Sequence, residues 1–143
     1  MDWNGVIDVL TTAASFDRRR VDKPDIQAWQ AAFLARGITS RSDSIRAVAE
    51  HYADSTDWLM PAHVIDRVKA MRATRVRGLD DSDFTPDIGR VDGGEDARAY
   101  LNTLRARRTL VMDGVPLEEA IARVPRPACV PISREWARLA VEA

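Results

Sequence analysis

Two amphipathic stretches meet at a proline near the middle of the chain, and this junction constrains the fold more than any other feature. Apolar residues recur at helical spacing over 45–52 before it and over 64–71 after it. Proline lacks an amide hydrogen and its ring collides with the preceding turn, so Pro61 fits only the first turn of a helix. One helix therefore ends before this junction and another begins there. We expect the large apolar side chains of the connection to cover the end of a helical core: Trp58, Leu59 and Met60.

Helical patterns also precede the junction. Apolar spacing and end signals predict helices over about 2–15, 22–36, 43–54 and 61–77. Gly37 is expected to end the second helix because glycine readily adopts the left-handed conformation that closes helices. The segment 40–44 is rich in side chains that cap a helix start. The first 77 residues are therefore predicted to form a four-helix bundle.

The composition changes after residue 77. The segment 78–96 holds seven acidic residues, one basic residue and five glycines or prolines, so it is interpreted as a flexible acidic linker. Beyond it, short amphipathic helices are predicted over about 95–112, from Pro116 onward and from Ser133 onward. The expected fold is all-α, with an N-terminal bundle (1–77), an acidic linker (78–96) and a C-terminal helical region (97–143).

Enzymatic chemistry finds no support in the residue pattern. A hydrophobic content of 45% and a charged content of 30% indicate a globular chain. No glycine loop of the phosphate-binding type is present, and two histidines with a single cysteine, Cys129, are too few for the usual zinc sites. We therefore expect no catalytic residue, no cofactor and no metal. The absence of a leader-like or membrane-spanning stretch, together with the lone cysteine, favours the cytoplasm.

Basic residues are concentrated outside the acidic segment, although the formal net charge is only −1. They form a run of three arginines, a stripe along the fourth predicted helix and the outer face of the fifth. Such groups contact phosphates in nucleic-acid-binding proteins, but they are equally typical of solvated surfaces and of helix C-termini. The candidate nucleic-acid contacts are Arg18, Arg19, Arg20, Lys69, Arg72, Arg75, Arg77, Arg105, Arg107 and Arg108.

The C-terminal helices are too short to be stable in isolation. Their apolar faces must pack on the rest of the chain or on a partner, and a partner groove would accept anchors at this helical spacing. The candidate partner-binding residues are Leu117, Ile121, Val124, Trp136 and Leu139.

The first 77 residues resemble small, non-enzymatic phage and prophage replication proteins of the helicase loader/inhibitor (replisome organiser) type. The resemblance lies in four short helices with an aromatic–proline junction, and the C-terminal half has no part in it. The matching features are Val6, Ile7 and Leu10 in the first helix, Trp29 in the second, His51-Tyr52 ending the third, and the segment 58–64 entering the fourth.

The resemblance implies a protein-binding role in replication initiation, with the replicative helicase or another replication protein as the partner. The chain lacks the nucleotide site of ATP-driven loaders, so any loading would rely on binding energy alone. Two alternatives stay open: direct DNA binding through the basic residues, and inhibition of a host factor by a phage protein in the host cytoplasm. The oligomeric state is left undetermined.

Overall fold

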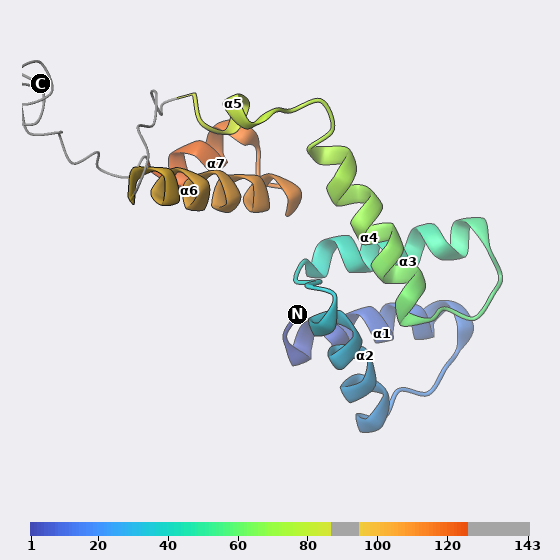
Figure 1. The fold of residues 1–143 in the computed structure, drawn as a ribbon. Coiled ribbons are helices and arrows are strands. Elements are labelled where there is room, and N and C mark those ends of the chain that lie inside the picture. Colours follow the sequence, from blue (N-terminus) through green and yellow to red (C-terminus); the bar gives the residue numbers. More distant parts are fainter. Residues whose placement is uncertain (87–94, 126–143) are drawn as a thin grey trace, which may run out of the picture. The chain divides into compact units, whose positions relative to one another are not determined.

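The structure, a computed structural model, describes residues 1–86 and 95–125, and over these residues it is entirely helical (Figure 1). The chain divides into two compact units. The first comprises residues 1–77 with the turn 112–114, and the second comprises residues 78–111 and 115–143. The prediction of an all-α fold is confirmed. The predicted helix from Ser133 lies outside the described residues.

The first unit contains four helices: α1 (Trp3–Asp17), α2 (Lys23–Ala35), α3 (Arg41–Asp54) and α4 (Pro61–Arg75). Helix α3 packs against both α1 and α4, and α2 packs against α1 and α4 (Figure 1). Their apolar faces form one core, whose fully buried members include Val6, Leu10, Phe33, Val48 and Val64. Burial of such side chains contributes roughly 1.5–3 kcal/mol each, which explains why the amphipathic pattern specifies the bundle.

Local signals set the helix ends. The side chain of Ser40 accepts a hydrogen bond from the backbone N–H of Asp43 (3.2 Å) and caps α3. Asp22 and Asp25 form a capping box at the start of α2. Gly37 has a φ of +65°, as expected for a residue that closes a helix in the left-handed region.

The junction before α4 differs from the prediction in one respect. Leu59 is fully buried, but Trp58 and Met60 are 56% and 51% exposed. The interpretation of all three as core residues was therefore wrong for two of them. Met60 has an extended backbone, and neighbouring side chains of an extended segment point to opposite sides, so the segment buries only one of the three.

The second unit is built from α5 (Asp81–Phe84), α6 (Glu95–Met112) and α7 (Leu117–Arg123). Arg107 lies in its interior with no exposed surface. Its Nε donates to the carbonyl of Val124 at the end of α7 (2.8 Å), and an Nη atom donates to the carbonyl of Phe84 in α5 (2.9 Å). The expectation that Arg107 lies on the outer face of its helix was wrong, because these two backbone carbonyls require a buried donor.

The acidic segment is more structured at its start than a flexible linker. Asp80 caps α5 by accepting from the backbone N–H groups of Ser82 and Asp83. Phe84 and Thr85 are buried in the second unit. Residues 78–86 therefore belong to this unit, and the remainder of the expected linker, residues 87–94, lies outside the described part. None of the described helices is long and apolar enough to cross a membrane.

Candidate functional site

An exposed aromatic surface lies where the end of α1 meets the connection between α3 and α4. We call it the Trp58 surface and define it by Phe16, Tyr52, Trp58 and Met60. The Phe16 and Tyr52 rings stack with centroids 4.9 Å apart, although Phe16 is 53% exposed. Three of the five large exposed apolar side chains of the described residues gather here. Such clustering on a small protein is typical of an interaction site rather than of scattered surface residues.

A largely buried ion pair supports this surface from beneath. Arg19 and Asp17 form a salt bridge whose side chains are only 7% and 11% exposed, and the Tyr52 hydroxyl donates to the same carboxylate. Burial by itself would raise the pKa of Asp17, but the hydrogen bonds from Arg19 and Tyr52 lower it to about 2. Burial and the hydrogen bond to Asp17 raise the pKa of Tyr52. The three groups therefore act as one charged network at neutral pH.

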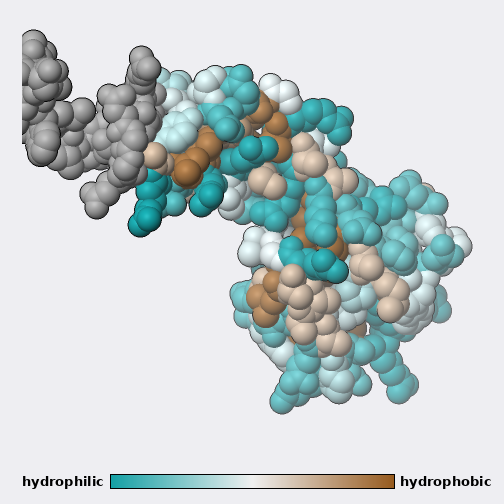
Figure 2. Space-filling view, in the orientation of Figure 1, coloured by the Kyte–Doolittle hydropathy of each residue, from teal (hydrophilic) through white to brown (hydrophobic). Residues whose placement is uncertain are grey.

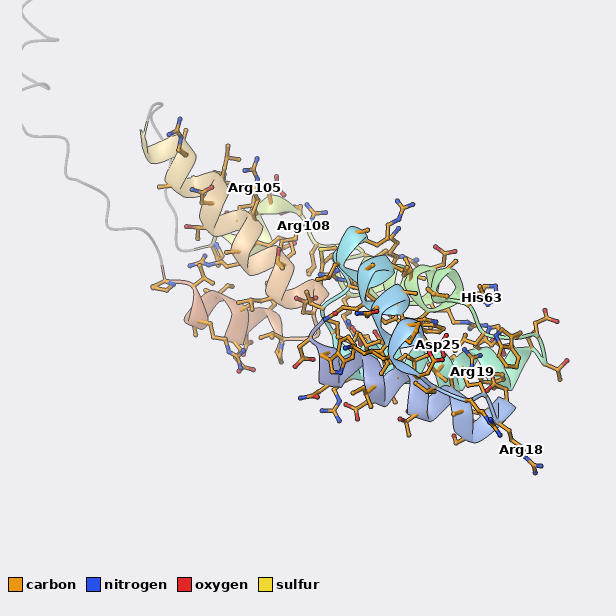
Figure 3. All side chains as sticks on the ribbon, turned by 90° about the horizontal axis from the view of Figure 1, so that it is seen from below. Arg18, Arg19, Asp25, His63, Arg105 and Arg108 are labelled. Atoms are coloured by element: carbon orange, nitrogen blue, oxygen red, sulfur yellow. The ribbon has the colours of Figure 1, made fainter. Side chains whose placement is uncertain are left out.

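Arg19 also holds the loop that carries Trp58. An Nη atom donates to the carbonyl of Leu59 (3.0 Å), and the guanidinium carbon lies 4.4 Å from the centre of the Trp58 ring. The same carbon lies 5.7 Å from the ring centre of Trp29 in α2. A guanidinium over an aromatic face is attractive by about 0.5–2 kcal/mol. In Figure 3 Arg19 lies among the helices, whereas Arg18 projects from the end of α1.

Two histidines fix the same loop from its other side. The Nε2 atom of His51 lies 2.9 Å from the carbonyl of Asp57, so Nε2 carries the proton, because a carbonyl can only accept. The backbone N–H of Met60 donates to Nδ1 of His63 (3.3 Å). The two imidazole rings stack with centroids 4.9 Å apart. Among the described residues no group of three potential ligands is arranged to hold a metal ion.

A pocket of about 190 Å³ opens beside Trp58. Its lining combines apolar and charged side chains from α1, the α1–α2 connection, α2 and the α3–α4 loop. Arg20 and Asp25 also line the pocket, and neither side chain forms a salt bridge within the described residues. The complete lining is Leu10, Arg19, Arg20, Asp25, Trp29, Trp58, Leu59 and Met60.

The candidate basic residues separate into two groups. Four are used within the fold: Arg19 and Arg107 as described, Arg72 as a donor to the carbonyl of Gly37 (3.1 Å), and Arg75 in a salt bridge with Asp43 (2.5 Å). The stripe predicted on α4 is therefore mostly engaged in packing that helix to its own unit.

The other basic candidates face solvent. Arg108 is partly exposed and lies 3.6 Å from Asp81, and in Figure 3 it projects from the same side of α6 as Arg105. The exposed members come from both units. They are Arg18, Arg20, Lys69, Arg77, Arg105 and Arg108.

None of the apolar residues predicted to bind a partner belongs to the Trp58 surface. Leu117, Ile121 and Val124 are half-buried in the second unit, while Trp136 and Leu139 lie outside the described residues. Figure 2 shows brown, hydrophobic side chains between hydrophilic ones over α6 and α7. The sequence reasoning missed Phe16 and Trp58 as exposed residues. The sequence did hold a signal for the exposure of Trp58. Residues 58–60 are three consecutive large apolar residues, and one short connection does not bury all three.

The fold and this site define the class of the molecule: a small helical protein that presents an aromatic surface built around a buried arginine–carboxylate pair. No family model, curated protein or solved structure matches the chain.

Proposed function

We propose that this protein is a non-enzymatic adaptor that binds another protein through the Trp58 surface. The observation that carries the proposal is the exposure of Phe16, Trp58 and Met60 around Arg19, which contacts both the Trp58 ring and the Tyr52 hydroxyl. Trp and Tyr side chains are among those that contribute most to binding energy in protein interfaces, and this surface contains one of each. Exposing several large apolar groups on a small protein is unfavourable unless a partner covers them.

The resemblance of residues 1–77 to phage and prophage replication proteins suggests which class of protein the partner belongs to. We propose that the partner is the replicative helicase or another replication protein, and that the protein acts in the cytoplasm where that partner works. The C-terminal apolar residues Leu117, Ile121 and Val124 are half-buried, so they rank below the Trp58 surface as contacts.

Binding of the purified full-length chain to a purified replicative helicase tests this proposal. We expect micromolar or tighter binding, and we expect Trp58→Ala to weaken it about tenfold or more, as for an interface hot spot. Leu34→Ala is the matched control because Leu34 is also a large exposed apolar residue (61%) but lies outside the Trp58 surface. Absence of binding at micromolar concentration, or equal effects of the two substitutions, would count against the proposal.

A second candidate is direct DNA binding by the exposed basic residues. Its support is the exposure of six of the candidates: Arg18, Arg20, Lys69, Arg77, Arg105 and Arg108. Each phosphate contact would reduce the logarithm of the affinity by about 0.9 per decade of salt. A shift of duplex or single-stranded DNA that does not depend on salt, or no shift at all, would contradict it.

A third candidate uses the same surface to disable a host factor. A helicase unwinding assay separates it from the adaptor role: an adaptor leaves unwinding unchanged or increases it, whereas an inhibitor decreases it when the chain is added.

A further inference from the structure

We propose that protonation of His63 releases the loop that carries Trp58, so that mildly acidic pH weakens binding through the Trp58 surface. This inference rests on the proposed binding role of that surface and adds a means of regulating it. Its basis is the geometry of the two stacked histidines, His51 and His63, and of the loop backbone that they hold.

His63 accepts a hydrogen bond that only a neutral imidazole can accept. It occupies the third position of α4 (Figure 3), and the backbone N–H of Met60 donates to its Nδ1 atom (3.3 Å). A protonated imidazole carries a hydrogen on each nitrogen and can only donate. A proton on Nδ1 therefore removes this bond and places two N–H groups against each other. The loop loses the contact that fixes its last residue before α4.

The charge would also lie at an unfavourable end of its helix. His63 is in the first turn of α4, where the partial positive charge of the helix N-terminus disfavours a cation. Arg67 lies one turn further along the same helix face and is a second positive charge. Both effects act against a protonated His63 in the closed loop.

The stacked ring of His51 opposes a charge in the same way. The two ring centroids are 4.9 Å apart and the ring planes differ by 14°. His51 is only 5% exposed, so a charge on it is unfavourable, and two imidazolium rings at this distance repel. Its Nε2 bond to the carbonyl of Asp57 does not depend on the state of Nδ1. His63 is therefore the histidine whose protonation breaks a hydrogen bond of the loop.

The carboxylates of α3, of the loop and of α4 do not offset this charge. Neither imidazole forms a salt bridge with a carboxylate of the described residues. Asp54 at the end of α3 is paired with Arg67 (3.1 Å). Asp57 on the loop and Asp66 on α4 are exposed, so water screens their charges.

The charged groups that α1, α2 and their connection contribute near the loop are balanced. Asp17 and Arg19 form a salt bridge beneath Tyr52, whose ring packs edge-on against the buried histidine. The pKa of Asp17 is about 2, so this pair keeps its charges at mildly acidic pH. Arg20 and Asp25, which line the neighbouring pocket, carry opposite charges.

The sign of the pH dependence follows from the protons that each state binds. The closed loop requires a neutral His63, whereas a released loop leaves Nδ1 free to take a proton. The released state therefore binds more protons, and lowering the pH favours it. Histidine side chains change charge between about pH 8 and pH 5, so the Trp58 surface is formed at the upper end of this range and is lost toward the lower end.

A pH titration of the full chain from pH 8 to pH 5, followed by nuclear magnetic resonance, tests the inference. The probes are the backbone amide signal of Met60 and the indole N–H signal of Trp58. We expect the two signals to move together with one midpoint at about pH 6–7. The indole signal of Trp3, which is not part of the Trp58 surface, should stay in place and thereby exclude unfolding of the whole unit.

Two substitutions of His63 separate its proton from its hydrogen bond. Glutamine at the third helical position is a capping-box residue that accepts the same bond and does not titrate, so His63→Gln should keep the Met60 and Trp58 signals constant. His63→Ala removes the acceptor at every pH and should give the low-pH Trp58 signal already at pH 8. Signals of the unmodified chain that do not change with pH, the same titration in His63→Gln, or equal movement of the Trp3 signal would each overturn the inference.

Helicase binding at pH 7.5 and pH 5.8 separates failure of this inference from failure of the proposed function. We expect the lower pH to weaken binding of the unmodified chain about fivefold more than binding of His63→Gln, because fewer molecules then have a formed surface. If Trp58-dependent binding changes equally in both chains, the inference is wrong and the adaptor role stands. If the Trp58 and Met60 signals titrate as expected but no replication protein binds at either pH, the loop switch stands and the partner proposed above is wrong.

Discussion

Replacing Asp17 by asparagine should destabilise the first unit at neutral pH and remove the part of its acid sensitivity near pH 3 that Asp17 contributes. Asparagine keeps the size of the side chain but lacks the charge that Arg19 and Tyr52 contact. The pKa of Asp17 is about 2 in the folded protein, compared with 3.8 for an unperturbed aspartate. Because the folded-state pKa is lowered, ionised Asp17 stabilises the folded protein. That contribution is present above pH 3.8 and is lost as the pH falls through about 2.

The two pKa values set the size of the expected loss in the free energy of unfolding. A difference of about 1.8 corresponds to about 2.4 kcal/mol, at 1.36 kcal/mol per pKa unit. Because the network lies at the edge of the core, where solvent screens part of the charge, we expect Asp17→Asn to cost about 2 kcal/mol at pH 7. The difference between wild type and variant should shrink below pH 3.8 and vanish only below about pH 2.

Urea unfolding at pH 7, 5, 3.5 and 2 provides the assay. Three of the four tryptophans, Trp3, Trp29 and Trp58, lie in the first unit, so in a Trp136→Phe background tryptophan fluorescence reports on that unit. Asp8→Asn is the matched control, because the salt bridge of Asp8 with Arg41 is more exposed and should contribute less than about 1 kcal/mol. A loss below about 0.5 kcal/mol for Asp17→Asn, or a loss that does not depend on pH, would refute the reasoning about the buried network.

Substitutions at three further positions, each with its own measurement, test the rest of the fold. Arg107→Ala should cost about 3 kcal/mol or more, because it removes the donor from two backbone carbonyls and opens a cavity. The control Arg105→Ala replaces an exposed side chain and should change stability by less than about 0.5 kcal/mol. Hydrogen exchange of the α6 amides measures both variants. Gly37→Ala should cost about 1–2 kcal/mol because of the positive φ, and Gly37→Asn should cost less; the urea midpoint of tryptophan fluorescence compares them. Ser40→Ala should cost about 1 kcal/mol in the same assay by removing the cap of α3, and an unchanged midpoint would contradict that role.

The helices were predictable because their determinants are local. The range predicted for the long C-terminal helix, 95–112, agrees with α6, and the proline at the start of α4 and the glycine after α2 lie where the junction argument requires. Capping side chains and proline act within one or two turns, so the chain displays them without any knowledge of its tertiary contacts.

The burial of individual arginines was not predictable in the same way. Arg105 and Arg107 are two residues apart on one helix, yet one is exposed and the other is fully buried. What separates them is the presence of two backbone carbonyls supplied by α5 and by the end of α7, which are distant in sequence. Similarly, Arg18, Arg19 and Arg20 look alike in the sequence, and only the packing of Tyr52 and Leu59 near the middle one assigns it to the interior.

The exposed aromatic surface was missed because periodicity predicts which helix face is apolar but not whether the loop residues find room inside. The core has space for Leu59 at the junction, and its neighbours remain outside. Phe16 lies one residue before Asp17 at the end of α1, where a helical pattern provides no signal for a contact with α3.

The three hydrogen bonds that hold the loop of residues 57–60 have a consequence for the speed and cost of recognition. The carbonyls of Asp57 and Leu59 and the N–H of Met60 all have side-chain partners, so the backbone that carries Trp58 is ordered before any partner arrives. Association then avoids the entropy cost of ordering a loop, which is roughly 1–2 kcal/mol for each residue whose backbone must be fixed. A partner would therefore meet a preformed surface, and cutting any one of these three hydrogen bonds should slow its capture without altering the groups that it contacts.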